Sequence, residues 1–263
     1  REHVQLIHSW VMEFLAKSND ALGRAGPVCP FARPSMDRDL LWVAVVVGTS
    51  PPIADAIAEI RELTETFLAL PPDSGPDSLL KAVVIAFPDV VDHTLIDKIQ
   101  RALKSDFVEA GLMIGQFYQG CTEPGLWNPQ FRPLESPVPL VAIRHMVSND
   151  FPFLNSTPAW IEAYLRRFAP TVPSPVRAAL EKGAALIPSA KKRGGVGATL
   201  DVPLGHKDAA YVRSHFDAME ARVADAPRAN EIVVAVVVTD SGRPLPCVGG
   251  LTASEIKGVD GLR

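Results

Sequence analysis

Cysteine is scarce in this chain of 263 residues. The chain has three cysteines, Cys29, Cys121 and Cys247, which lie far apart in the sequence. An odd number of widely spaced cysteines argues against a disulfide framework and against a cysteine-rich zinc site. We therefore expect a reducing, cytoplasmic environment. No run of 18 apolar residues occurs, so the sequence predicts no membrane span. The first residues also lack the basic segment and apolar run of a signal peptide.

An excess of positive charge is also missing. The chain has 26 Lys and Arg against 30 Asp and Glu, a net charge of −4, and no basic stripe, so nucleic acid is a poor expectation. The sequence contains no HExxH, no GxSxG and no carboxylate-rich metal motif. The glycines at 191–199 have the wrong spacing for a phosphate-binding loop. Neither nucleic acid nor a membrane is therefore an expected partner, and a homodimer stays open.

Apolar residues make up 47% of the chain and follow two periods. Spacings of three and four residues predict amphipathic helices, and continuous β-branched runs predict buried strands. Helices are predicted at 2–22, 53–69, 93–108, 157–168, 174–186 and 206–224, and strands at 40–47, 79–87, 111–118, 139–147 and 231–238. This order indicates an α+β fold, in which a mixed sheet of about five strands is covered by helices.

Two regions are expected along the chain. Residues 1–155 form an α/β core domain with a Cys-Pro loop and a ligand pocket. Residues 156–263 form a mainly helical extension with one strand, packed on the same domain. The strand at 139–147 follows its predecessor without a helix between them, which favours an antiparallel orientation. Thr157 is the expected N-cap of the next helix, because a proline follows it at the first helical position.

The segment GPVCPFARPSM, residues 26–36, contains the cysteine with the least conformational freedom. Pro30 has a fixed φ and pushes Cys29 toward an extended backbone. A thiol presented from such a stiff loop is suited to act as a nucleophile or a metal ligand. Burial of Cys29 in ordinary loop packing is the alternative.

A second candidate site lies in the segment IRHMVSND, residues 143–150. Within a strand, Arg144 and His145 point to opposite faces. A histidine at a strand end suits a metal ligand or a general base, and an arginine there suits a carboxylate. A hydrogen-bonded core histidine and a surface arginine are the structural alternative.

Two segments resemble a bacterial family related to the YqcI/YcgG proteins. They are CPFA at 29–32 and FRPLESPVPLVAIRHMVSNDFPFL at 131–154, and the likeness covers roughly residues 25–155. Members of the wider group include haem-dependent N-oxygenases of small-molecule biosynthesis, which act on amino or guanidino nitrogen. The matching residues are Cys29, Pro30, Phe31, Arg132, Pro137, Pro139, Arg144, His145 and Asp150.

The resemblance implies that haem b binds between the Cys-Pro loop and the strand at 139–147. The axial ligand would be Cys29 or His145, with Tyr118 as a third choice. The residues expected to contact the haem are Pro30, Phe31, Arg132, Arg144, Tyr118 and Trp127, the arginines binding the propionates. Relatives often carry Phe-His-Pro after the third strand, where this chain has Phe117-Tyr118-Gln119. If that histidine ligates iron in the relatives, this chain lacks it.

The sequence therefore leaves three hypotheses for the function. The first is a haem-dependent oxygenase that acts on a nitrogen-containing small molecule, with Cys29 and His145 as catalytic residues. The second is a protein that binds a small metabolite without converting it. The third is a thiol enzyme, in which Cys29 is the nucleophile and His145 the base.

Overall fold

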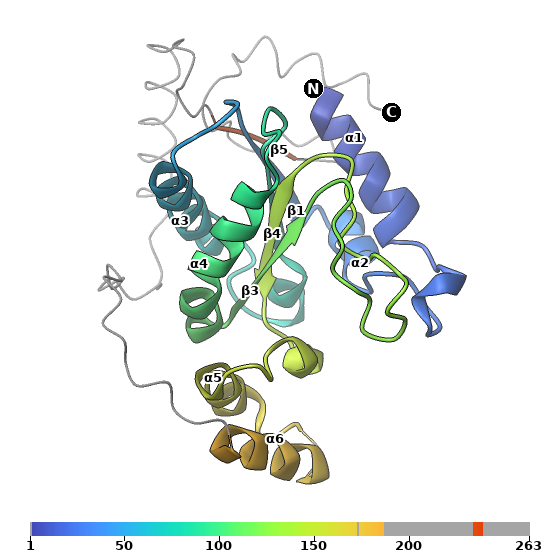
Figure 1. The fold of residues 1–263 in the computed structure, drawn as a ribbon, viewed down its shortest axis with the longest axis vertical. Coiled ribbons are helices and arrows are strands. Elements are labelled where there is room, and N and C mark those ends of the chain that lie inside the picture. Colours follow the sequence, from blue (N-terminus) through green and yellow to red (C-terminus); the bar gives the residue numbers. More distant parts are fainter. Residues whose placement is uncertain (1, 173, 187–233, 239–263) are drawn as a thin grey trace.

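The computed structural model describes residues 2–172, 174–186 and 234–238 (Figure 1). Five strands form one mixed sheet in the order β3-β4-β2-β1-β5. The strands are β1 (Leu41–Val46), β2 (Ala82–Ala86), β3 (Leu112–Phe117), β4 (Leu140–His145) and β5 (Val234–Val238). β1 and β2 are parallel, whereas β4 is antiparallel to both of its neighbours and β5 is antiparallel to β1. The structure confirms the predicted α+β fold and the orientation of the strand at 139–147.

Helices cover both faces of this sheet (Figure 1). The α-helices that the structure describes are α1 (Glu2–Trp10), α2 (Ala32–Asp37), α3 (Ile53–Ala69), α4 (Thr94–Ala110), α5 (Pro158–Phe168) and α6 (Ser174–Leu186). One face packs against α3 and α4, and the other packs against α1 and α2. We call these the α3/α4 face and the α1/α2 face.

Side chains alternate between the two faces along β1 and β2. In β2, Val83 and Ile85 pack on the α3/α4 face, whereas Val84 and Ala86 pack on the α1/α2 face. Ile143 of β4 lies in the same layer as Val83, its partner across the strands. Because helices bury both faces, β1 and β2 are apolar throughout instead of alternating with polar residues.

The described part of the C-terminal region packs directly on the core domain. A third apolar cluster joins Val108 of α4 and Met146 after β4 to Tyr164 of α5, and α6 packs on α5. The expected start of α5 is confirmed, since the Thr157 hydroxyl accepts the N–H of Trp160 at 3.3 Å. This contact satisfies one of the free donors at the helix N-terminus.

The first predicted helix, 2–22, is wrong in length. α1 ends at Trp10 and continues only as a π-helical segment, Val11–Leu15. Beyond it, the Asn19 side chain accepts the N–H of Ala21 at 2.9 Å. Serine and asparagine side chains compete with helical hydrogen bonds in this way, and so the sequence Lys-Ser-Asn ends the helix.

Three short helical segments were not predicted from the sequence. They are α2 and the 3-10 helices Pro76–Leu80 and Ser148–Phe153. Each contains proline, which suggested loops. Pro34 and Pro76 lie in a first helical turn, where proline is tolerated, whereas Pro152 lies inside the 3-10 helix Ser148–Phe153. The expected helix at 206–224 and loop at 188–199 lie outside the described residues. Among the helices that the structure describes, none is long and apolar enough to cross a membrane.

Candidate functional site

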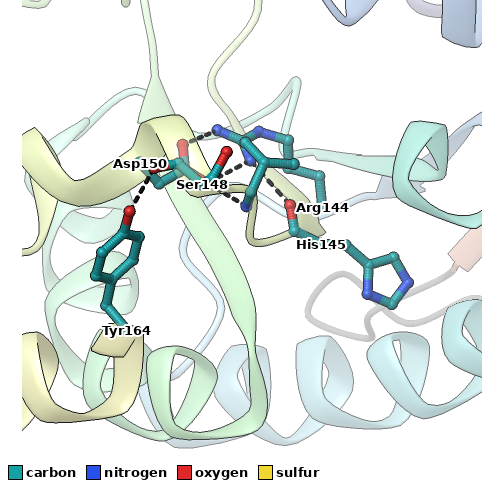
Figure 2. A network of polar contacts seen from close by, with 6 residues as sticks. Arg144, His145, Ser148, Asp150 and Tyr164 are labelled. Atoms are coloured by element: carbon teal, nitrogen blue, oxygen red, sulfur yellow. Dashed lines mark hydrogen bonds and ion pairs between the residues drawn. The ribbon is translucent and has the colours of Figure 1, made fainter. Parts of the chain in front are cut away.

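The end of β4 separates the two residues that the sequence singled out there. Arg144 and His145 are successive strand residues, so their side chains leave opposite faces of the sheet. The Arg144 guanidinium lies 5.3 Å from the ring centre of Phe31, on the α1/α2 face. The His145 ring lies 5.9 Å from that of Phe67 of α3, and Figure 2 shows it directed away from the guanidinium. The structure therefore does not bring His145 and Cys29 together on one face of the sheet.

Cys29 sits in a loop that backbone hydrogen bonds hold on the α1/α2 face. Its N–H donates to the carbonyl of Leu15 at 2.8 Å, and the N–H of Val28 donates to that of Lys17 at 3.0 Å. The thiol is free and half-buried against the apolar layer under α1. Pro30 and Phe31 then lead the chain directly into α2. The loop therefore presents Cys29 and Phe31 from the same short segment.

A buried ion pair fixes the guanidinium of Arg144 (Figure 2). Its Nη1 donates to Asp150 Oδ2 at 2.8 Å, and its Nη2 donates to Asp150 Oδ1 at 2.6 Å. The Asp150 side chain is only 3% exposed, whereas that of Arg144 is 25% exposed. Asp150 also accepts the backbone N–H of Val147 at 2.8 Å. The carboxylate thus ties the turn after β4 to the arginine at its end.

This arrangement sets the charge state of the site. Burial opposes the charged form of Arg144, but the hydrogen bonds and charge of Asp150, and then the nearby Cys29, raise the pKa of Arg144. Tyr164 closes the network by donating its hydroxyl to the carbonyl of Ser148 at 2.5 Å. Burial, followed by the charge of Asp150, raises the pKa of Tyr164. Arg144 therefore stays charged and Tyr164 stays protonated at neutral pH.

Two N–H groups of Arg144 remain available. A guanidinium carries five N–H donors; Asp150 takes two, and the carbonyl of His145 takes a third, from Nη1 at 2.9 Å. Asp150 occupies the fork between Nη1 and Nη2, so the remaining donors are Nε–H and the second N–H of Nη2. These two form the parallel fork along the side of the guanidinium, and neither has a partner among the described residues.

Lys81, on the α3/α4 face, was missed from the sequence. It is 1% exposed, and its Nζ donates to the carbonyls of Leu68 and Leu70, at 3.2 and 2.5 Å, where α3 ends. Nζ also lies 5.3 Å from the ring centre of Phe67. Burial lowers the pKa of Lys81 to about 8, although the charge of Asp73 acts in the opposite direction. The sequence feature that could have indicated this buried cation is the single lysine directly before the apolar strand β2.

His145 shares this environment with Lys81. Extending the register of β2 and β4 by one residue places the two side chains opposite each other. Burial, followed by the positive charge of Lys81, lowers the pKa of His145. The histidine is therefore neutral at pH 7, and it belongs to the packing around Phe67 instead of the Cys29 site.

Tyr118 also lies away from the Cys-Pro loop. It packs against the core of the α3/α4 face, and its hydroxyl lies 3.2 Å from both carboxylate oxygens of Asp97. The His93 ring is 5.0 Å away. Burial, followed by Cys121 and Asp97, raises the pKa of Tyr118. The phenol therefore remains protonated and acts as a hydrogen-bond donor to Asp97.

The long loop after β3 folds back on the segment before the Cys-Pro loop. The Asn128 side chain donates to the carbonyl of Ala21 at 2.7 Å. Gly23 has a φ of 79°, and a Cβ there would meet the Trp127 carbonyl oxygen at 3.0 Å, so this close approach requires glycine. Trp127 itself is 63% exposed. Arg132 donates to the carbonyls of Pro129 and Phe131, at 2.5 and 3.1 Å, within its own loop.

The residues expected to bind haem therefore do not surround one space. Cys29, Phe31 and Arg144 gather on the α1/α2 face, whereas His145 and Tyr118 lie across the sheet. Within the described residues, no three His, Cys, Asp or Glu side chains are grouped to hold a metal ion. Of the three expected axial ligands, Cys29 lies on the same face as Arg144, and His145 and Tyr118 lie on the other.

Two family models match the chain. The one described as a domain of unknown function, DUF6875, matches residues 4–179, which include the Cys-Pro loop, β1 to β4 and Asp150. The one described as amino acid synthesis matches residues 167–249, which include α6 and β5. Neither the curated proteins nor the solved structures gave a match.

Replacing Asp150 with alanine tests the buried ion pair. The variant leaves the Arg144 charge without its partner, and so we expect a loss of about 3 kcal/mol in the free energy of unfolding, measured with urea. Asp106→Ala is the matched control, because it breaks the exposed pair with Arg61 and should cost less than about 1 kcal/mol. Equal losses in the two variants would contradict this role of Asp150.

The pKa of Lys81 predicts a pH dependence of stability. Between pH 8 and 10.5 the unfolded chain holds a proton that folded Lys81 has released, so the free energy of unfolding rises with pH across this window. Lys81→Met should lose that rise, which amounts to at most about 3 kcal/mol. Urea unfolding at several pH values measures it, with exposed Lys98→Met as the control. Parallel profiles for wild type and Lys81→Met would refute the prediction.

Proposed function

The chain belongs to the DUF6875 family, and for this member we propose a binding site for a small, carboxylate-bearing metabolite at Arg144. The observation that carries the proposal is the unused fork of Nε–H and Nη2–H on a guanidinium whose other donors are occupied. A carboxylate accepts two parallel N–H···O bonds from such a fork. Because Asp150 already neutralises Arg144, recognition would depend on hydrogen-bond geometry more than on net charge.

The surroundings of Arg144 support this role by holding the fork in position. Asp150 fixes one edge of the guanidinium, and the Phe31 ring lies against it at 5.3 Å. An arginine that is already ordered loses little conformational entropy when a ligand binds. Its 25% exposure leaves part of the group accessible from outside.

An amino acid or a close derivative is the ligand class we propose. Such a molecule carries the carboxylate that the Arg144 fork recognises. The match of residues 167–249 to the model described as amino acid synthesis also favours this class. The loop that carries Cys29 also places the Phe31 ring 5.3 Å from the Arg144 guanidinium, so a ligand bound to the fork would lie on the face of the sheet that contains the thiol.

Haem-dependent N-oxygenation of such a nitrogen-containing molecule is the second candidate. It rests on the resemblance of CPFA and residues 131–154 to the YqcI/YcgG-related family, and on the placement of Cys29 and Arg144 on one face. In this form of the proposal, Cys29 alone would ligate the iron of haem b, and Arg144 would contact a propionate. A thiol enzyme has less support, since His145 lies across the sheet from Cys29.

Paired ligands that differ only in the carboxylate test the first proposal. L-arginine and L-alanine should raise the melting temperature of the protein, and agmatine and ethylamine should not. Arg144→Lys keeps a positive charge beside Asp150 but loses the planar fork, so affinity for the amino acids should fall by about tenfold or more. Arg132→Lys is the control and should bind as wild type. Equal binding of acids and amines would refute the carboxylate site.

An absorption spectrum tests the haem candidate separately. If haem binds through Cys29, protein supplied with haemin shows a Soret band, and Cys29→Ala shifts or abolishes it. Cys121→Ala is the control, because Cys121 lies beside Tyr118, and it should leave the spectrum unchanged. A wild-type protein without a Soret band would eliminate this candidate and leave the carboxylate site standing.

A further inference from the structure

The matched DUF6875 domain leaves β1 at the edge of its own sheet. Residues 4–179 contain four strands in the order β3-β4-β2-β1. β5, which pairs with β1, lies outside that match and inside the match to the amino acid synthesis model. The neighbour of β1 is therefore contributed by a segment that resembles a different family.

The edge that β5 covers has no protection of its own. β1 reads LWVAVV, without charge, proline or glycine, and five of its six residues are buried. Natural edge strands avoid unwanted pairing through charged residues, proline, bulges or a covering element. Since β1 has none of the sequence devices, a strand alongside it is what protects this edge.

The opposite edge of the sheet is different. β3 contains Gly115 and Gln116, and its last three residues are only partly buried. The Gln100 side chain of α4 donates to the carbonyl of Ile114 at 3.4 Å. A helix side chain therefore engages the backbone of β3, whereas the backbone of β1 pairs with another strand.

The pairing of β1 with β5 depends on main-chain contacts that any copy of the chain can supply. Five residue pairs form the antiparallel ladder, from Trp42 with Val238 to Val46 with Val234. In the sequence, 47 residues (187–233) separate α6 from β5. A separation of this length does not restrict β5 to β1 of its own chain.

We infer that the edge of β1 is a strand-acceptor site for β5 of a second copy, which would replace the β5 that pairs with β1 within the chain. Main-chain hydrogen bonds supply the affinity in such strand addition. Reciprocal exchange of β5 between two copies would produce a symmetric dimer with every edge pairing retained.

Cysteine pairs in register test both parts of the inference. Ala44 faces Val236 in the ladder, so the double variant Ala44→Cys/Val236→Cys should form a disulfide within one chain under mild oxidation. Single variants Ala44→Cys and Val236→Cys, mixed in solution, should form a cross-linked heterodimer if β5 docks between copies. Ala142→Cys, in the central strand β4, replaces Ala44→Cys in the control mixture and should give no heterodimer.

A second pair keeps the test decisive if one variant fails to fold. Val46→Cys and Val234→Cys lie at the other end of the same ladder and should behave in the same way. Failure of both double variants to cross-link would refute the pairing of β1 with β5. Cross-linking within the double variants, with no heterodimer above the Ala142→Cys control, would refute exchange between copies. Neither result depends on ligand binding at Arg144, so this inference and the proposed function fail independently.

Discussion

The alternation of side chains along β4 is the constraint on which the arrangement of the site depends. Helices bury both faces of the sheet, so each residue at the end of this strand enters one of two separate layers. Arg144 enters the layer that contains Cys29 and Phe31, and His145 enters the layer that contains Phe67 and Lys81. The sheet therefore separates Cys29 from His145, the two residues that the sequence suggested as nucleophile and base.

Near the C-terminal end of β4, each face of the sheet contains a buried cation, and the two cations are stabilised in different ways. On one face, Asp150 forms a bidentate ion pair with Arg144, which keeps the guanidinium charged and oriented. On the other, no carboxylate of the described residues lies within hydrogen-bonding distance of Lys81, whose ammonium instead donates to the carbonyls at the end of α3. Because burial of an unpaired ammonium disfavours its charged form, the pKa of Lys81 falls while that of Arg144 rises. On the Arg144 side, two N–H groups of the guanidinium have no hydrogen-bond partner among the described residues.

Local patterns in the sequence were enough to predict most of the fold. The apolar stripes gave α3 and α6 with their observed bounds, and the Thr-Pro start of α5 carried its own capping signal. Where short-range polar contacts decide the backbone, as at Asn19, periodicity alone extended the helix too far. Proline at 34 likewise concealed α2, because the same residue is compatible with a first helical turn and with a loop.

The candidate site was predictable only in part, because it depends on contacts distant in sequence. Strand alternation already placed Arg144 and His145 on different faces, but which face the Cys-Pro loop covers is decided by its bonds to the segment after α1. The partner of Arg144, Asp150, is only six residues away and was named from the resemblance. Lys81 became significant only when the end of α3 was seen to pack over it.

The most direct test of this account is a crystal structure of the protein with L-arginine bound. We predict the ligand carboxylate within hydrogen-bonding distance of Arg144 Nε and Nη2, with the Asp150 pair intact and Phe31 and Cys29 nearby. A ligand seated beside His145 and Lys81, or an Arg144 fork already filled by another protein group, would contradict it.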